Sequence, residues 1–261
     1  GEQDVKRFKL VYLANEHDQE EFETRIDHVV KCRVCDLTIM NHIDVEEGCV
    51  IMPLSLYSCA TLVNLTLYCV VLEAPRSKLV SLPCVKTMHL EEVRFDGSKI
   101  LKTLISSCLA LEELTIVALP NLYYDGGCGE EWGLVACVCS QSLKSFKLES
   151  TTHRDIQIDA PRLEYLSIRD YRCESLTIRS IAPYAEVNLD VKLNVELDDP
   201  LERSKICDFL KAISTVRKMI IAAPTLSSFV VTLSLIRCLS FLICLTWKLL
   251  FPNLLGNSCQ V

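Results

Sequence analysis

A short pattern of three apolar residues recurs along this chain. Two residues of any kind separate the first from the second, and one residue of any kind separates the second from the third. The stretches SCATLVNLTL (58–67) and SCLALEELTI (107–116) contain it in nearly the same form, 49 positions apart. Eight copies follow this spacing, the last two more loosely: Val34, Leu37 and Ile39; Leu62, Leu65 and Leu67; Val85, Met88 and Leu90; Leu111, Leu114 and Ile116; Leu143, Phe146 and Leu148; Leu163, Leu166 and Ile168; Tyr184, Val187 and Leu189; Val216, Met219 and Ile221. We therefore expect a repeated structural unit.

The spacing between copies identifies the unit. Their central residues lie 28, 23, 26, 32, 20, 21 and 32 positions apart, and a period of about 20–30 residues with this pattern is typical of leucine-rich repeats. Alternate side chains of a strand point to opposite faces. Leu65 and Leu67 should therefore point into the stack, and Asn64, Thr66 and Tyr68 should point out. The predicted fold is α/β: an irregular leucine-rich-repeat solenoid, with a parallel β-sheet on its concave face and helices or loops on its convex face.

The segments between the strands are expected to return along the convex side. One reads as a helix with Ser98 as N-cap and an apolar face of Ile100, Leu101, Leu104, Ile105 and Cys108. Another should begin at Asp199-Pro200 and carry the apolar residues Ile206, Phe209, Leu210 and Ile213 on one side. The stretch DGGCG (125–129) lies in a long interval and is expected to bulge out as a turn.

Charge divides the chain into parts. All 34 acidic residues lie at or before Asp208, and from Leu226 onward only Arg237 and Lys248 are charged. We expect three parts: residues 1–33 leading into the repeats, residues 34–225 forming the repeat domain, and an apolar, divergent tail at 226–261. The tail has three interpretations: a membrane anchor through residues 229–247, divergent sequence from altered splicing or a frameshift, or further buried repeats.

Composition narrows the functional classes. Of the 261 residues 50% are hydrophobic, 15 are cysteine, and the net formal charge is -7. An acidic chain without a basic cluster is a poor candidate for binding nucleic acid. The cysteines are scattered through apolar runs, which favours reduced, core-packed thiols in a cytoplasmic or nuclear protein. The alternative is attachment to a membrane through the tail.

The sequence offers little chemistry beyond binding. Cys32 and Cys35 have CxxC spacing and Cys137 and Cys139 form a second close pair, but a zinc site needs four ligands and CxC is not its usual second half. The histidines lie beside no recognisable nucleophile or metal motif. We therefore predict no catalytic residue, no metal site and no cofactor.

The outward strand positions are the candidates for function. Aromatic residues and arginine are enriched where proteins contact one another. The predicted partner contacts are Tyr68, His89, Tyr165 and Arg169, with the alternative that they are ordinary exposed strand residues. The mixed charge around them favours a protein or peptide partner.

Three segments resemble the plant F-box proteins that carry leucine-rich repeats and a C-terminal FBD region. They are FETRIDHVVKCRVCDLTI (22–39), DAPRLEYLSIRDY (159–171) and RSKICDFLKAISTVRKMIIAAPTL (203–226). The resemblance implies the substrate-binding part of an SCF-type ubiquitin ligase receptor. In such proteins an F-box binds the ligase adaptor and the repeats hold the target.

The resemblance has two departures. No F-box is present, and because the chain begins with Gly1 rather than Met, we expect it upstream. Adaptor binding is therefore assigned to no residue here. The tail after Leu226 also departs from the family. The alternative function is a repeat-based interaction scaffold without a ligase role, as a truncated or membrane-anchored paralogue.

Overall fold

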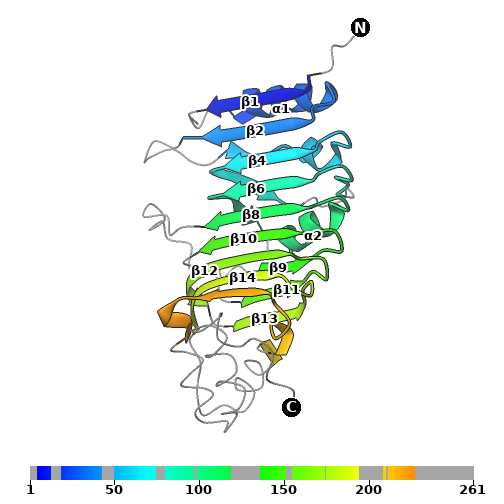
Figure 1. Ribbon diagram of the computed structural model, residues 1–261. Helices are drawn as coiled ribbons and strands as arrows, with labels where there is room; N and C mark the ends of the chain where they lie inside the picture. The colour runs from blue at the N-terminus through cyan, green and yellow to red at the C-terminus, as the bar shows by residue number, and fades with distance from the viewer. Residues whose placement is uncertain are drawn as a thin grey trace, which may run out of the picture.

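The computed structural model describes residues 5–12, 19–42, 50–74, 80–96, 99–118, 136–150, 155–173, 175–193, 208–209 and 211–226. Its main feature is a nine-stranded parallel sheet that runs the length of the described structure (Figure 1). Its strands, in spatial order, are β1 (Arg7–Tyr12), β2 (Asp36–Asn41), β4 (Asn64–Tyr68), β6 (Thr87–Glu91), β8 (Glu113–Ala118), β10 (Ser145–Ser150), β12 (Tyr165–Cys173), β14 (Glu186–Leu193) and β15 (Lys218–Ile221). All eight predicted copies contribute a strand, and the fold is the predicted α/β repeat solenoid.

The sheet begins one strand earlier than the repeat pattern predicted. Strand β1 pairs in parallel with β2, with Phe8 opposite Leu37 and Leu10 opposite Ile39. The signal was present in the sequence, because Val5, Phe8 and Leu10 follow the repeat spacing. The predicted series of copies starts instead at Val34, Leu37 and Ile39.

The core consists of apolar rows that cross the strands. Leu65 and Leu67 of β4 are buried, whereas Asn64 is exposed and Thr66 and Tyr68 are half-buried on the other face, as predicted. The parallel register places each inward residue beside its equivalent in the next repeat. The first six copies bury all three of their apolar residues, and the stack shares one continuous core. The last two copies depart from the prediction: Tyr184 is 75% exposed and has a φ of 67°, and Val216, Met219 and Ile221 are only partly buried.

Two small parallel sheets form part of the return segments, where helices or loops were predicted. One has the order β3-β5-β7 and the other β13-β11-β9. Their strands are β3 (Val50–Ile51), β5 (Val70–Glu73), β7 (Arg94–Asp96), β9 (Ala136–Cys139), β11 (Asp155–Asp159) and β13 (Ser175–Ser180). In Figure 1 the second small sheet lies behind the lower strands of the large sheet.

A backbone corner joins the large sheet to the first small one. Cys69, between β4 and β5, and Glu92, after β6, have φ values of 56° and 54°. The two residues occupy equivalent repeat positions. The Cys69 N–H donates to the Glu91 carbonyl at 2.9 Å, and the Glu92 N–H donates to the Val117 carbonyl at 2.8 Å. These hydrogen bonds to the next repeat hold a conformation that is uncommon for residues other than glycine.

Some of the other described return segments contain helices, and the rest are turns or irregular. The helices are α1 (Gln19–Lys31), α2 (Ile100–Ser107) and a 3-10 helix at Leu54–Ser58. Helix α2 has the predicted buried face, but the residue at its N-cap is Lys99, without a side-chain cap, and Ser98 lies outside the described residues. Helix α1 was not predicted, although Phe22, Ile26 and Val29 mark its buried side at helical spacing.

The structure describes only part of the C-terminal region for which the sequence makes predictions. Phe209 and Ile213 are buried, as the predicted helix face requires. Its start at Asp199-Pro200, the turn at 125–129 and the tail beyond Leu226 lie outside the described residues. In the parts of the chain that the structure describes, no helix is both long and apolar enough to cross a membrane. The candidate span at 229–247 lies outside them.

Candidate functional site

The outward side chains of the nine-stranded sheet form a surface that we call the exposed face. They stand in three rows across the strands. The first row is Arg7, Asp36, Asn64, Thr87, Glu113, Ser145, Tyr165, Glu186 and Lys218. The middle row is Lys9, Thr38, Thr66, His89, Thr115, Lys147, Ser167, Asn188 and Ile220. The third row is Val11, Met40, Tyr68, Glu91, Val117, Glu149, Arg169 and Asp190.

Two predicted contact residues, Tyr68 and His89, lie on neighbouring strands. The His89 Nε2 atom is 3.0 Å from Oε2 of Glu91, which stands opposite Tyr68 in the register. The Tyr68 ring lies 5.8 Å, centroid to centroid, from the ring of His42. Burial raises the pKa of Tyr68, and electrostatic repulsion from the neighbouring Cys69, Glu91 and Glu92 raises it further. Tyr68 therefore remains a protonated hydroxyl at neutral pH.

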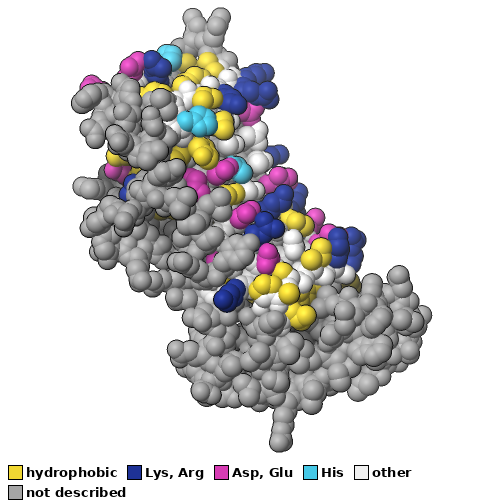
Figure 2. Space-filling model, turned by 90° about the vertical axis from the view of Figure 1, so that its left-hand side faces the viewer, with side chains coloured by type: hydrophobic (Ala, Val, Ile, Leu, Met, Phe, Trp, Pro, Cys, Tyr) yellow, Lys and Arg dark blue, Asp and Glu magenta, His cyan; other side chains and the backbone are white. Residues whose placement is uncertain are grey.

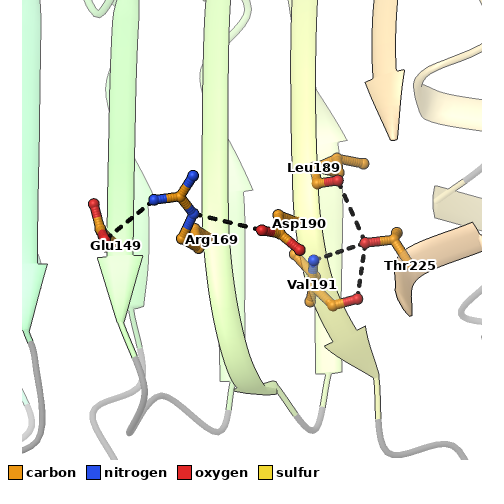
Figure 3. A network of polar contacts seen from close by, with 6 residues as sticks. All are labelled: Glu149, Arg169, Leu189, Asp190, Val191 and Thr225. Atoms are coloured by element: carbon orange, nitrogen blue, oxygen red, sulfur yellow. Dashed lines mark hydrogen bonds and ion pairs between the residues drawn. The ribbon is translucent and has the colours of Figure 1, made fainter. Parts of the chain in front are cut away.

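The other two predicted contacts, Tyr165 and Arg169, share strand β12. Arg169 Nη1 lies 3.3 Å from Oε1 of Glu149 on β10, and its Nε lies 3.5 Å from Oδ2 of Asp190 on β14 (Figure 3). Two carboxylates thus orient the guanidinium across three strands. The Lys147 ammonium lies 5.7 Å from the centroid of the Tyr165 ring, within range of a cation–π contact.

The four predicted contacts therefore share one surface but form two groups. The strands β6 and β12 that carry His89 and Tyr165 are three strand steps apart, which is about 14 Å at the usual strand spacing. A partner that touches both groups has to span that distance. Their role in binding stays a prediction.

Charged side chains also line the edge where the strands begin. Glu112 lies between two lysines, with Lys144 Nζ at 2.7 Å from Oε2 and Lys86 Nζ at 4.0 Å from Oε1. The hydrogen bond from Lys144 and its charge lower the pKa of Glu112, and Lys86 contributes further.

Replacing Lys144 with methionine should raise the Glu112 pKa toward its ordinary value of about 4.3. Because the folded-state pKa is lowered, the carboxylate stabilises the fold above its unfolded pKa, and this contribution is lost as the pH falls through the folded value. An NMR titration of the Glu112 side-chain carbonyl measures the pKa in both proteins. Equal values would contradict the assigned role of Lys144.

The cysteine pairs do not converge on a metal site. Cys32 is buried, with Sγ 3.7 Å from His28 Nε2, and Cys35 Sγ lies 3.9 Å from the Arg33 carbonyl oxygen. Cys137 and Cys139 have sulfurs 3.6 Å apart on β9. Within the described ranges, no group of three or more His, Cys, Asp or Glu side chains is placed to hold a metal ion.

The thiols should differ strongly in reactivity. Burial raises the pKa of Cys108 to about 11, partly offset by a hydrogen bond with Ser107, whereas Cys84 is exposed. Iodoacetamide at pH 8 should alkylate Cys84 at least about tenfold faster than Cys108, because the thiolate is the nucleophile. Mass spectrometry of timed digests measures both rates, and urea-unfolded protein is the control in which they converge. Equal rates in the folded protein would contradict the burial of Cys108.

The residues that sequence reasoning missed lie at the N-terminal end of the exposed face. Once β1 is added to the sheet, Arg7, Lys9 and Val11 join the rows, and Met40 becomes their neighbour on β2. The alternation of Phe8 with Leu10 was the available signal.

This geometry defines a class of protein. A parallel sheet with apolar rows inside and polar, aromatic and charged rows outside is the architecture of a leucine-rich-repeat solenoid, a class that offers an extended binding surface.

Comparisons with known proteins agree with this class and narrow it. A family model described as "FBD-associated F-box protein At5g56370, LRR repeats" matches residues 23–187. The FBD-associated F-box protein At1g60410 of Arabidopsis thaliana is 51% identical over 228 residues, 86% of this chain and 54% of the relative. The F-box/FBD/LRR-repeat protein At1g80470 of the same plant is 51% identical over 233 residues, 87% of this chain and 47% of the relative. No solved structure matches the chain.

The chain belongs to the F-box/FBD/leucine-rich-repeat family of plants. It spans about half the length of the curated relatives that it matches. The family names of these relatives indicate interaction proteins rather than enzymes.

Proposed function

We propose that this chain is the target-binding part of a substrate receptor for an SCF-type ubiquitin ligase. The observation that carries the proposal is the exposed face: nine parallel strands present three rows of polar, aromatic and charged side chains on one side. The F-box names of the relatives supply the link to a ligase.

The proposed role requires no chemistry by the chain itself. A target held on the exposed face is brought near the ligase, and proximity raises its effective concentration there. We place this activity in the cytoplasm or nucleus, where the free thiols of the described core remain reduced.

The test uses the complete natural reading frame, obtained by sequencing the native transcript and expressed in plant cells. Partners captured by the intact protein are compared with those captured by a variant with Tyr165→Ala and Tyr68→Ala. Lys102→Ala on helix α2 is the matched surface control. The proposal predicts that a captured partner is ubiquitinated more when the intact protein is expressed, and that the double variant loses both binding and ubiquitination.

Two results would contradict the ligase role. One is a partner that binds the exposed face while its ubiquitination stays unchanged, which would support an interaction scaffold instead. The other is a reading frame without an F-box. Equal capture by the intact protein and the double variant would contradict the exposed face as the binding surface.

A further inference from the structure

The N-terminal end of the exposed face carries a row of apolar side chains. Val11, Met40 and Tyr68 stand side by side on β1, β2 and β4. Val11 is 55% exposed, and Met40 and Tyr68 are half-buried. We call these three residues the apolar shelf.

An exposed histidine extends the apolar shelf. His42 follows β2, and its N–H donates to the Tyr12 carbonyl at 2.7 Å, which fixes the backbone there. Its ring packs against Tyr68 at 5.8 Å. Figure 2 shows hydrophobic, histidine and Lys or Arg side chains close together at the upper end of the described surface.

Positive charge lies on the β1 side of the apolar shelf. Lys6, Arg7 and Lys9 lie on or just before β1, with Asp36 of β2 beside them, whereas Glu91 of β6 borders the other side of the shelf, opposite Tyr68. Asp36 already accepts hydrogen bonds from Arg7 and from Asn64. Among the described residues, Lys9 has no ion-pair partner, and its side chain stands on the exposed side of β1.

The rest of the exposed face has a different balance. From β8 to β14 the first and third rows contain four carboxylates: Glu113, Glu149, Glu186 and Asp190. The same strands carry two cations, Lys147 and Arg169, and Arg169 pairs with Glu149 and Asp190. Carboxylates are in excess there, whereas the outward charges of β1, Arg7 and Lys9, are positive, so an acidic partner is favoured at the β1 end.

We propose that the N-terminal end of the exposed face binds an extended acidic segment of a target protein, in which an acidic and an apolar residue stand two positions apart. The apolar side chain packs on the shelf of Val11, Met40 and Tyr68, and the carboxylate pairs with Lys9. This inference rests on the proposed function, because it assumes that the exposed face binds protein.

The spacing supports this pairing. Lys9 and Val11 are two residues apart on β1 and point to the same side. In an extended chain such residues are separated by about 6.8 Å. In a bound segment that runs along the strand direction, side chains two residues apart have the same separation. A segment whose carboxylate pairs with Lys9 therefore places its apolar side chain at Val11.

The experiment is a selection from a random dodecapeptide display library on the immobilised chain, followed by affinity measurements on the enriched peptides. The expected result is enrichment of peptides with an acidic and an apolar residue two positions apart. Lys9→Glu and Tyr68→Ala should each weaken their binding by about tenfold or more, the effect typical of a central contact. A peptide with lysine in place of its acidic residue should bind Lys9→Glu better than the unchanged protein.

Lys147→Glu is the matched control, because it makes the same charge change in the same row at β10. It should leave the affinity within about twofold. Thermal melts of each variant confirm that the fold is kept. Failure to enrich acidic peptides would overturn the inference.

The remaining outcomes separate this inference from the proposed function. Enriched peptides that lose binding with Tyr165→Ala but not with Lys9→Glu would overturn the inference and keep the exposed face as a binding surface. Peptides unaffected by any of these changes would contradict both.

Discussion

Replacing Phe146 with alanine is expected to lower the free energy of unfolding by about 3–5 kcal/mol. The Phe146 side chain is fully buried on β10 and lies between Leu114 of β8 and Leu166 of β12 in the register. Removing the ring leaves a cavity that the rigid stack cannot close, because β10 is held by hydrogen bonds to both β8 and β12. The effect is large because a solenoid is stabilised mainly through contacts between adjacent repeats.

Urea denaturation followed by circular dichroism measures this loss. Ser145→Ala is the matched control, since Ser145 is the neighbouring residue on the outward face, and it should change the stability by less than about 0.5 kcal/mol. Equal effects of the two substitutions would contradict the assigned inward and outward faces of β10.

Replacing Thr225 with valine is expected to reduce the stability by about 1–3 kcal/mol, even though the two side chains have nearly the same shape. The Thr225 hydroxyl is fully buried; it accepts a hydrogen bond from the Val191 N–H at 2.7 Å and lies 2.8 Å from the Val191 carbonyl oxygen, to which it donates (Figure 3). Strand β15 ends at Ile221. Beyond that point the Thr225 hydroxyl, rather than the backbone of β15, is the hydrogen-bond partner of Val191 in the last part of β14. Valine leaves both groups of Val191 buried without that partner.

Amide hydrogen exchange gives the direct measurement. The Val191 amide should exchange faster in Thr225→Val than in the unchanged protein, whereas Thr225→Ser, which keeps the hydroxyl, should retain most of its protection. The same exchange rate in all three proteins would contradict the role of the hydroxyl.

Much of the large sheet follows from the sequence because two regularities coincide. Alternation within each strand sets which residues are buried, and the repeat sets which residues become neighbours. The same reasoning extends to β1 once Val5, Phe8 and Leu10 are included.

The return strands could not be derived in the same way. Stretches such as VVLE, which forms β5, are too short to separate a strand from a helix by periodicity. Strand β5 follows the backbone corner at Cys69, and a positive φ at a cysteine has no signal in the sequence.

For the candidate site, too, some features could be predicted from the sequence and others could not. Alternation predicted that Tyr68, His89, Tyr165 and Arg169 point outward. The contact of His89 with Glu91 is also foreseeable, because residues two apart on a strand share a face. The ion pairs of Arg169 are not foreseeable in this way. Glu149 and Asp190 are 20 and 21 residues away along the chain, and only the register between strands of different repeats brings them to Arg169.

The central claim is that the exposed face of the nine-stranded sheet is the partner-binding surface. Its most direct test places a photo-crosslinking amino acid at one position of the full-length protein, either Ser167 in the middle row of that face or Ser106 on helix α2, which packs against β7 and β9. The account predicts a covalent adduct with the captured partner from position 167 and none from position 106. An adduct from position 106 alone would contradict it.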